Sequence, residues 1–333
     1  MTRRDVFTLA AVTWLAGRGR RLQALAAPQA RLGWHRLGAD AWMVEHGGGN
    51  TTVLADRGGA IVIDTKMPGV GGVLAAEVAA RVGPIDTVIL THHHGDHAGG
   101  LPAFGGRPIL AQANAAARIR ADVATAMAQA TADPAAAARD LLTSLATDFD
   151  YPTTLESTRL IEQFVRSTAG TDPGRALPTT AVDARHTATF GTSALDLVHV
   201  GPGHTDNDLI VADRRRDLIV AGDLVFDGYH PFVDDRAGAS TVGWQRSLAA
   251  ALALAGPATR IVPGHGRVVT RAGLVEQSRY FDRVRELVTA GRARGQTRDQ
   301  VMATPISRDQ LALGFASEWP HTLGVVFDEL AGG

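Results

Sequence analysis

The sequence contains no cysteine, and Lys66 is its only lysine. The absence of thiols excludes disulfide bonds, thiolate catalysis and cysteine-ligated zinc, so any bound metal has to be held by histidine and carboxylate side chains. A single lysine leaves little scope for Schiff-base chemistry, which needs a reactive amine. The formal net charge of −1 argues against a polyanionic partner such as nucleic acid.

The sequence also lacks an uninterrupted apolar run of about eighteen residues, so we expect no membrane-spanning segment after processing. Its beginning is unusual, because Arg3 and Arg4 precede an apolar stretch over 7–17, and Ala24-Leu25-Ala26 follows as a cleavage candidate. These features resemble a twin-arginine export signal within residues 1–30. We therefore expect an exported, periplasmic protein. The alternative is an ordinary amphipathic first helix in a cytoplasmic protein.

Short apolar runs between glycine-rich or polar turns predict strands, and longer runs with helical apolar spacing predict helices. Strands are expected over 41–46, 51–55, 60–64, 86–90, 108–111, 194–200, 209–212, 218–221 and 260–262. Helices are expected over 70–82, 243–254 and 273–289. Residues 113–166 are alanine-rich and helical in character, which predicts a helical insertion over about 113–180 that either covers the site or only packs on the sheet. Together these elements predict an α/β fold with a single domain over 31–333.

Four histidines and one aspartate lie within six consecutive positions, directly after an apolar run that ends at Leu90. The segment reads His92-His93-His94-Gly95-Asp96-His97. The whole chain of 333 residues contains only 12 histidines, so four of them within six positions is far from a random distribution. Imidazole and carboxylate groups this close together favour a divalent metal, above all zinc. A solvated His-rich loop or an affinity tag is the alternative, but a tag lies at a terminus and has no interleaved aspartate.

A short apolar run that leads into a histidine or an aspartate recurs along the chain. It does so at four places, which are His92, His204, Asp223 and His265. Metal ligands on loops at the edge of a rigid sheet would produce this pattern, and independent sites would be less inclined to share it.

In their order along the chain, these residues resemble the metal-binding segments of the metallo-β-lactamase superfamily, and the resemblance extends from about Leu32 to the C-terminal helix. It implies a four-layer αβ/βα sandwich with two zinc ions at one edge, iron and manganese being alternative metals. The implied ligands are His92, His94 and His204 for the first ion, Asp96, His97 and His265 for the second, and Asp223 as a bridge. Asp96 and Asp223 are also the implied catalytic residues, since their carboxylates offset the charge of two cations around a shared hydroxide.

The resemblance implies a hydrolase in which this hydroxide attacks a small acyl substrate, either an ester, a thioester, a lactone or a lactam. Asp223 favours glyoxalase II-like and lactonase relatives, because β-lactamases proper often carry cysteine or serine near that position. Four alternatives stay open: β-lactamase activity proper, an iron-dependent dioxygenase, phosphodiester cleavage and a non-catalytic exported metal-binding accessory protein. The expected partner is a small molecule and not nucleic acid, and the oligomeric state is left open.

Five further residues are interpreted around this centre. Asp64, at the end of an expected strand, resembles the buried aspartate that orients the histidine segment in the superfamily. Thr205 either caps the turn after His204 or donates to a ligand. Tyr229 and His230 follow Asp223 closely enough to be substrate-binding candidates, although packed loop residues would look the same. His93 is expected to point away from the metals.

Overall fold

The computed structural model describes residues 32–149, 151, 154–168 and 177–332. The chain folds as two compact units, Met1–Ala181 (unit 1) and Val182–Gly333 (unit 2), and each has its own sheet and its own apolar core. The predicted α/β fold class is confirmed. The predicted domain bounds, 1–30 and 31–333, stay a prediction, and the expected export signal lies outside the described residues.

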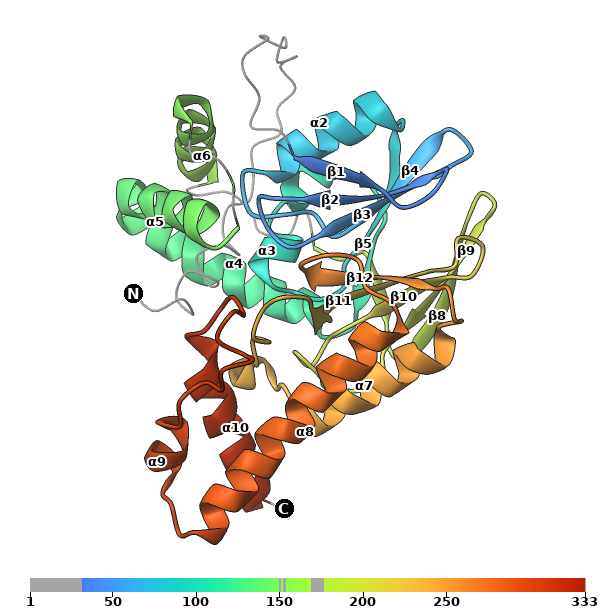
Figure 1. Cartoon of the computed structure of the whole chain (residues 1–333). Helices are drawn as coiled ribbons and strands as arrows, with labels where there is room; N and C mark the ends of the chain where they lie inside the picture. Colours follow the sequence, from blue (N-terminus) through green and yellow to red (C-terminus); the bar gives the residue numbers. More distant parts are fainter. Residues whose placement is uncertain (1–31, 150, 152–153, 169–176, 333) are drawn as a thin grey trace. The chain divides into compact units, whose positions relative to one another are not determined.

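Among its described residues, unit 1 forms a seven-stranded sheet with the strands in sequence order (Figure 1). The strands are β1 (Gly33–Arg36), β2 (Ala41–Glu45), β3 (Thr51–Asp56), β4 (Gly59–Ile63), β5 (Ile85–Ile89), β6 (Ile109–Gln112) and β7 (Thr180–Val182). Strands β1 to β4 pair antiparallel, whereas β4, β5 and β6 pair in parallel. Parallel neighbours need a crossover, which helix α2 (Gly71–Arg81) provides between β4 and β5.

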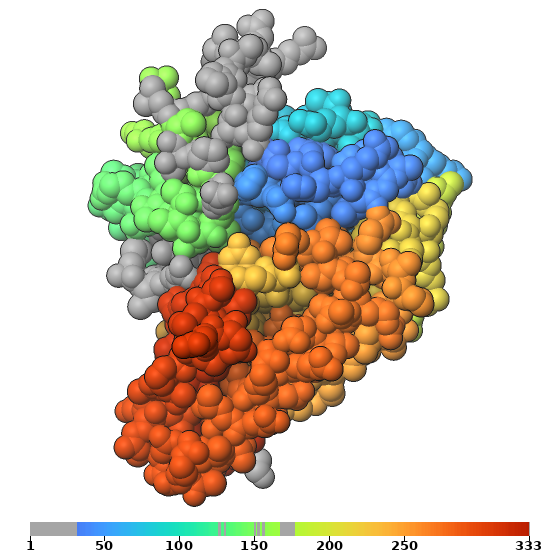
Figure 2. Space-filling view, viewed as in Figure 1, coloured from blue at the N-terminus to red at the C-terminus, as the bar shows by residue number. Residues whose placement is uncertain are grey.

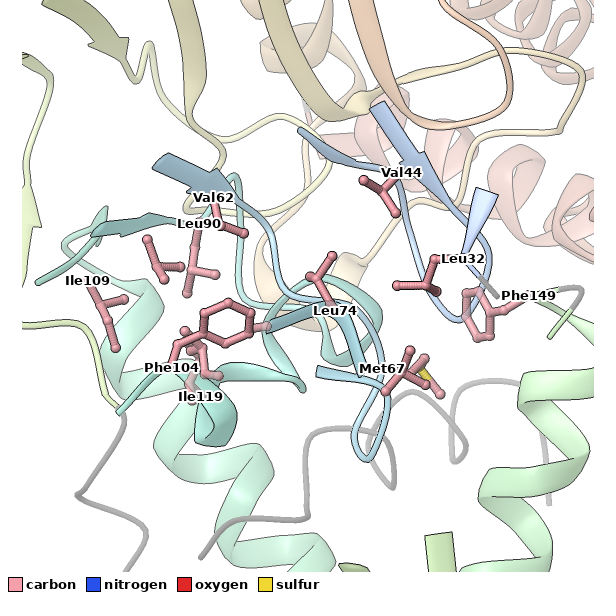
Figure 3. Close-up of a cluster of buried hydrophobic side chains, with 14 of the residues drawn as sticks. Leu32, Val44, Val62, Met67, Leu74, Leu90, Phe104, Ile109, Ile119 and Phe149 are labelled. Atoms are coloured by element: carbon pink, nitrogen blue, oxygen red, sulfur yellow. The ribbon is translucent and has the colours of Figure 1, made fainter. Parts of the chain in front are cut away.

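The apolar core of unit 1 fixes the strand that leads into the histidine segment. Leu74 and Val78 lie one helical turn apart on α2 and are fully buried. Figure 3 shows Leu74, Leu90 and Phe104, which come from separate parts of the chain, in one cluster of buried side chains. Each such side chain stabilises the fold by roughly 1.5–3 kcal/mol on burial. Because Leu90 follows β5 directly, this packing sets the position of the residues that come next.

The predicted helical segment over 113–166 is present as three helices, α4 (Ala115–Ala132), α5 (Pro134–Thr147) and α6 (Leu155–Thr168). The start of helix α5 is fixed by its sequence, because the Asp133 carboxylate accepts hydrogen bonds from two backbone N–H groups and Pro134 occupies the first turn. Leu141 and Leu145 are buried in the core of unit 1. The insertion is thus a packed part of unit 1.

Unit 2 contains a five-stranded sheet among its described residues, in the order β12-β11-β10-β9-β8. The strands are β8 (Arg185–Phe190), β9 (Ser193–Val198), β10 (Ile210–Asp213), β11 (Leu218–Phe226) and β12 (Arg260–His265). Strands β11 and β12 are parallel, whereas β8 to β11 pair antiparallel. Helices α7 (Thr241–Leu254) and α8 (Arg271–Ala293) pack side by side and contact β11 (Figure 1).

The chain ends in two further helices, α9 (Arg298–Met302) and α10 (Glu318–Gly332), which contact α8. Figure 2 shows the outer surface of these helices in orange and red. The remaining short elements are α3 (Gly95–Ala98), η1 (Leu101–Phe104) and η3 (Asp235–Ala237). Within the described part of the chain, none of the helices combines the length and apolarity needed to cross a membrane.

Candidate metal centre

The histidine segment of unit 1 lies at the carboxyl end of the parallel strand β5. After β5 the chain bends at Thr91 and continues without regular secondary structure to His94, and α3 then begins at Gly95. All four predicted ligands of this segment are at least 95 % buried, namely His92, His94, Asp96 and His97. The donor atoms of His92 and His94 lie within 4.8 Å of each other, as do those of Asp96 and His97. Unit 1 therefore gathers four buried ligands on one turn.

The proton positions on two of these imidazoles follow from their neighbours. Thr91 Oγ1 donates to the Asp64 carboxylate at 2.7 Å, so the His92 Nδ1–H donates to that hydroxyl oxygen at 3.1 Å. The Nδ1–H of His97 donates to Asp64 Oδ2 at 2.8 Å. In both rings Nε2 then carries the lone pair, which is the form that binds a metal. His97 Nε2 faces Asp96 Oδ2 at 3.3 Å, an arrangement of two electron-rich atoms that a cation stabilises.

Asp64 lies at the end of β4, as predicted, and is fully buried. Its carboxylate accepts from Thr91 N, Thr91 Oγ1 and His97 Nδ1, all at 2.7–2.8 Å. Its backbone is left-handed, with φ at +67°, a conformation that costs a non-glycine residue on the order of 1 kcal/mol or more. The Asp64 carboxylate thus fixes the orientation and the tautomer of the His97 ring directly, and those of the His92 ring through Thr91.

We expect Asp64→Asn to weaken metal binding, measured with zinc as the probe, by about 10–100-fold, because partners that orient a ligating imidazole typically contribute this much to metal affinity. Competition titration against a coloured chelator measures the effect. Asp140→Asn, on helix α5 of the same unit, is the control and should bind zinc as the wild type does. Equal zinc affinity in all three proteins would show that Asp64 does not orient the ligands.

Unit 2 contributes the other three predicted ligands, from β11, β12 and the loop before β10. His204, Asp223 and His265 are all at least 92 % buried. His204 Nδ1 donates to the Phe232 carbonyl at 2.7 Å, which again leaves the lone pair on Nε2. Asp223 Oδ2 lies 3.5 Å from His204 Nε2 and 3.5 Å from His265 Nε2. The carboxylate therefore stands between the two imidazoles, as expected of a ligand shared by two ions.

Gly264 makes room for this carboxylate. It precedes His265 on β12, and a Cβ atom at this position would lie 1.7 Å from Asp223 Oδ1. Real Cβ contacts are never this short, so only glycine allows β12 to approach Asp223 so closely. The ring of His265 stacks on that of Phe226, with ring centroids 5.4 Å apart and an interplanar angle of 12°.

Thr205 holds the turn that follows His204. Its hydroxyl donates to Asp208 Oδ1 at 2.7 Å and accepts from Asn207 N at 3.2 Å, and its backbone N–H also donates to the Asp208 carboxylate. These contacts match the turn-capping alternative. Any effect of Thr205 on the metal centre thus passes through the shape of this turn.

The two substrate-binding candidates have different surroundings. Tyr229 is partly exposed, and its ring lies 6.2 Å from that of His265 and 4.8 Å from that of Phe315. His230 is fully buried in the core of unit 2, where Nδ1 lies 2.9 Å from the Tyr280 hydroxyl and the ring packs against Trp319. Tyr229 remains a candidate for substrate contact, whereas the burial of His230 favours a packing role.

His230 should make stability depend on pH. Burial lowers its pKa, partly offset by a hydrogen bond with the Gln310 backbone. Below about pH 6.5 the unfolded chain binds a proton that the folded chain excludes, so stability is lost on acidification by up to about 1.4 kcal/mol per pH unit. We expect the stability difference between wild type and His230→Gln to shrink between pH 6.5 and 5.5, as measured by urea unfolding. A difference that stays constant over this range would contradict the lowered pKa.

Two residues near the ligands were not singled out from the sequence as parts of the site. Lys66 stands two positions after Asp64, and the sequence distinguishes it only as the single lysine. Gly49 belongs to a glycine-rich segment of the kind that predicts a turn, yet its backbone contacts the His97 ring. His93, expected to point away from the metals, has its Nε2 3.8 Å from the Asp122 carboxylate of α4. In the sequence, only the scarcity of lysine could have indicated that Lys66 has a special role.

Comparison with known proteins supports the same family that the ligand pattern suggested. The model of the metallo-beta-lactamase superfamily matches residues 44–265, a range that includes all seven predicted ligands. A metallo-beta-lactamase from Pontibacter korlensis is 16% identical, with a TM-score of 0.53 over 76% of this chain and 99% of that one. The DIM-1 metallo-beta-lactamase is 14% identical, with a TM-score of 0.53 over 74% of this chain and 95% of that one.

A structure of TMB-1 is likewise 14% identical, with a TM-score of 0.54 over 76% of this chain and 97% of that one. At these identities the solved structures show a common fold. A comparison with curated proteins finds no significant match. The buried histidines and aspartates of both units fit a metal-dependent hydrolase. By the extent of the family match and by its fold, this chain belongs to the metallo-beta-lactamase superfamily.

Proposed function

We propose that this chain is a dinuclear zinc hydrolase that acts on a small acyl substrate, either an ester, a thioester, a lactone or a lactam. The observation that carries the proposal is the fixed tautomer of three buried imidazoles. His92, His97 and His204 each use Nδ1–H in a hydrogen bond, so Nε2 is the atom left to bind a metal. A histidine kept only for packing would not require this arrangement at three separate places.

The ligands divide into two sets, with one residue common to both. The first zinc would be held by His92, His94 and His204, the second by Asp96, His97 and His265, and Asp223 would contact both. Two zinc ions, when bound, would lower the pKa of a shared water to near neutrality and stabilise the oxyanion that forms on the substrate. Histidine and carboxylate ligands accept zinc well, and iron and manganese are the alternatives.

The side chains of the protein then have separate tasks. Asp64 keeps the protons of His92 and His97 on Nδ1, directly or through Thr91. Asp223, whose Oδ2 lies 3.5 Å from the Nε2 atoms of His204 and His265, would hold both metals and offset part of their charge. Tyr229, next to the His265 ring, is the residue we propose for substrate contact.

Three features of the sequence favour acyl hydrolysis over the other reactions of this fold. The chain has no cysteine, and an aspartate occupies position 223, which favours the lactonase and glyoxalase II-like branches over β-lactamases proper. A net charge of −1 argues against a nucleic-acid substrate. Because the superfamily also has members that are not hydrolases, the reaction has to be tested directly.

The test starts from protein purified without added metal. We expect elemental analysis to find two zinc ions per chain. We also expect hydrolysis of at least one member of a panel of aryl esters, thioesters, lactones and a β-lactam. Treatment with a chelator should abolish this activity, and zinc should restore it. One iron and no zinc per chain would favour the dioxygenase alternative, and the absence of chelator-sensitive hydrolysis across the panel would contradict the proposal.

We also propose that the protein is exported, on the basis of the paired arginines at positions 3 and 4. Twin-arginine export carries folded proteins, which suits an enzyme that acquires its metal before transport. Cell fractionation of wild type and an Arg3→Lys, Arg4→Lys double variant tests this. The wild type should be found in the periplasm with a shortened N-terminus, and the variant should stay in the cytoplasm. A full-length wild type in the cytoplasm would support the alternative of a first helix.

A further inference from the structure

The single lysine of the chain is buried beneath the histidine segment. Lys66 lies between β4 and α2 and has no exposed surface. Its Nζ donates to the backbone carbonyl of Gly49 at 2.7 Å and to that of Val44. Its backbone is left-handed, with φ at +73°. A buried amine is costly, and a left-handed backbone adds to that cost, so a role beyond filling space is indicated.

The carbonyl that Lys66 contacts belongs to a glycine-rich loop, residues 47–50, which packs on two metal ligands. Gly49 N donates to the Asp96 carbonyl at 3.1 Å. A Cβ atom on Gly49 would lie 2.1 Å from both Cε1 and Nε2 of His97. The backbone of Gly49 therefore lies directly against the edge of the ring that has to present its lone pair to a metal.

The backbone around Lys66 is tied to the same ligand segment from a second direction. Thr65 donates to the His97 carbonyl through its backbone N–H at 2.6 Å and through its hydroxyl at 2.9 Å. Gly100 N donates to the Lys66 carbonyl at 2.8 Å, just beyond α3. Lys66 thus joins three parts of unit 1, which are strand β2, the glycine loop and the turn that carries Asp96 and His97.

We propose that Lys66 is a positioning residue for the metal bound by Asp96 and His97, and that it acts by holding the glycine loop against the His97 ring. This inference rests on the proposed function, since it assumes that these side chains bind a metal. It does not depend on which acyl substrate the enzyme takes.

The action of Lys66 does not require a particular charge. Burial lowers the pKa of Lys66 to about 7, while the carboxylates of Asp64, Glu45 and Asp96 act in the opposite direction. An ammonium group and a neutral amine can each donate the two hydrogen bonds that Gly49 and Val44 accept. The geometry of the loop is therefore expected to survive across neutral pH.

Lys66→Met tests the proposal, because methionine has a similar length but donates no hydrogen bond. We expect one of the two zinc-binding constants to fall by about 10–100-fold and the other to stay within about twofold, in competition titrations with a chelator. Thr87→Val is the control, since it removes a buried side-chain bond to the Pro108 carbonyl in the same unit. Two unchanged constants, or two constants that fall equally, would overturn the proposal.

A second measurement uses the wild-type protein and does not depend on whether the variant folds. Isotope-labelled lysine gives a single side-chain NMR signal, because the chain has one lysine. We expect the chemical shift of this Lys66 signal to change as zinc is added. Most of the change should accompany only one of the two zinc equivalents per chain. A signal that stays fixed through both equivalents would overturn the proposal. Neither readout requires turnover, so failure of the acyl substrate panel would count against the proposed function and leave this inference standing.

Discussion

Asp223→Ala should abolish the proposed hydrolysis and lower the zinc content from the two ions per chain that we propose to at most one. Asp223 Oδ2 lies 3.5 Å from both His204 Nε2 and His265 Nε2, so the substitution removes the carboxylate that stands between these imidazoles. Paired metal ions contribute several kcal/mol to transition-state stabilisation, which corresponds to a rate loss of about three orders of magnitude or more. Steady-state kinetics and elemental analysis on the same preparations measure both effects.

The matched control is Asp328→Ala, which removes another carboxylate of unit 2 from a surface ion pair with Arg298. Exposed pairs of this kind contribute at most about 1 kcal/mol, so zinc content and activity should stay as in the wild type. An Asp223→Ala protein that keeps two zinc ions would show that Asp223 is not the shared ligand. If it also kept its activity, the proposed mechanism would be wrong.

Gly264→Ala should have an effect almost as large, although it removes none of the predicted ligands. The added methyl group would lie 1.7 Å from Asp223 Oδ1, so either the carboxylate or strand β12 has to move. Displacement of a reacting group by about 1 Å can cost about 100-fold in rate. We therefore expect at least this loss in kcat/KM, together with weaker zinc binding, and only a partial loss of thermal stability.

Gly256→Ala is the control for Gly264→Ala. Gly256 lies in the same unit, and the nearest atom to an added Cβ there is the Thr259 hydroxyl oxygen at 3.5 Å, an ordinary contact. This variant should retain full activity. Wild-type kinetics in Gly264→Ala would mean that β12 can shift without displacing Asp223. The close contact between Gly264 and Asp223 would then have no catalytic importance.

Much of the fold was predictable because strand and helix periodicity are local properties of the sequence. The strands over 86–90 and 218–221 and the helix over 70–82 are present with shifted ends. Strand β11 continues to Phe226, beyond its predicted end, since Gly222 interrupts the apolar run but forms a bulge without ending the strand. Strand β8 was missed because its exposed residues, such as Arg185 and His186, give it little apolar character.

The site was predictable in its ligands and not in the residues that support them. The histidine segment and the later ligands each follow a short apolar run, a pattern visible in one sequence. The contacts of Gly49 with His97 and of Gly264 with Asp223 bring together residues about 40 positions apart or more. No local pattern encodes such contacts, because a glycine needed for space looks the same in a sequence as a glycine needed for a turn.

The left-handed backbones of Asp64 and Lys66 have a practical consequence for engineering. A redesign aimed at thermal robustness would select both positions for glycine or asparagine, since these residues adopt positive φ at lower cost. Such changes would relax the chain while they erase the carboxylate and the amine that hold His97 and its neighbouring loop. Because both side chains are fully buried, their removal would also leave hydrogen-bonding groups unpaired in the interior, so a redesign should keep Asp64 and Lys66, and screens should score metal content alongside melting temperature.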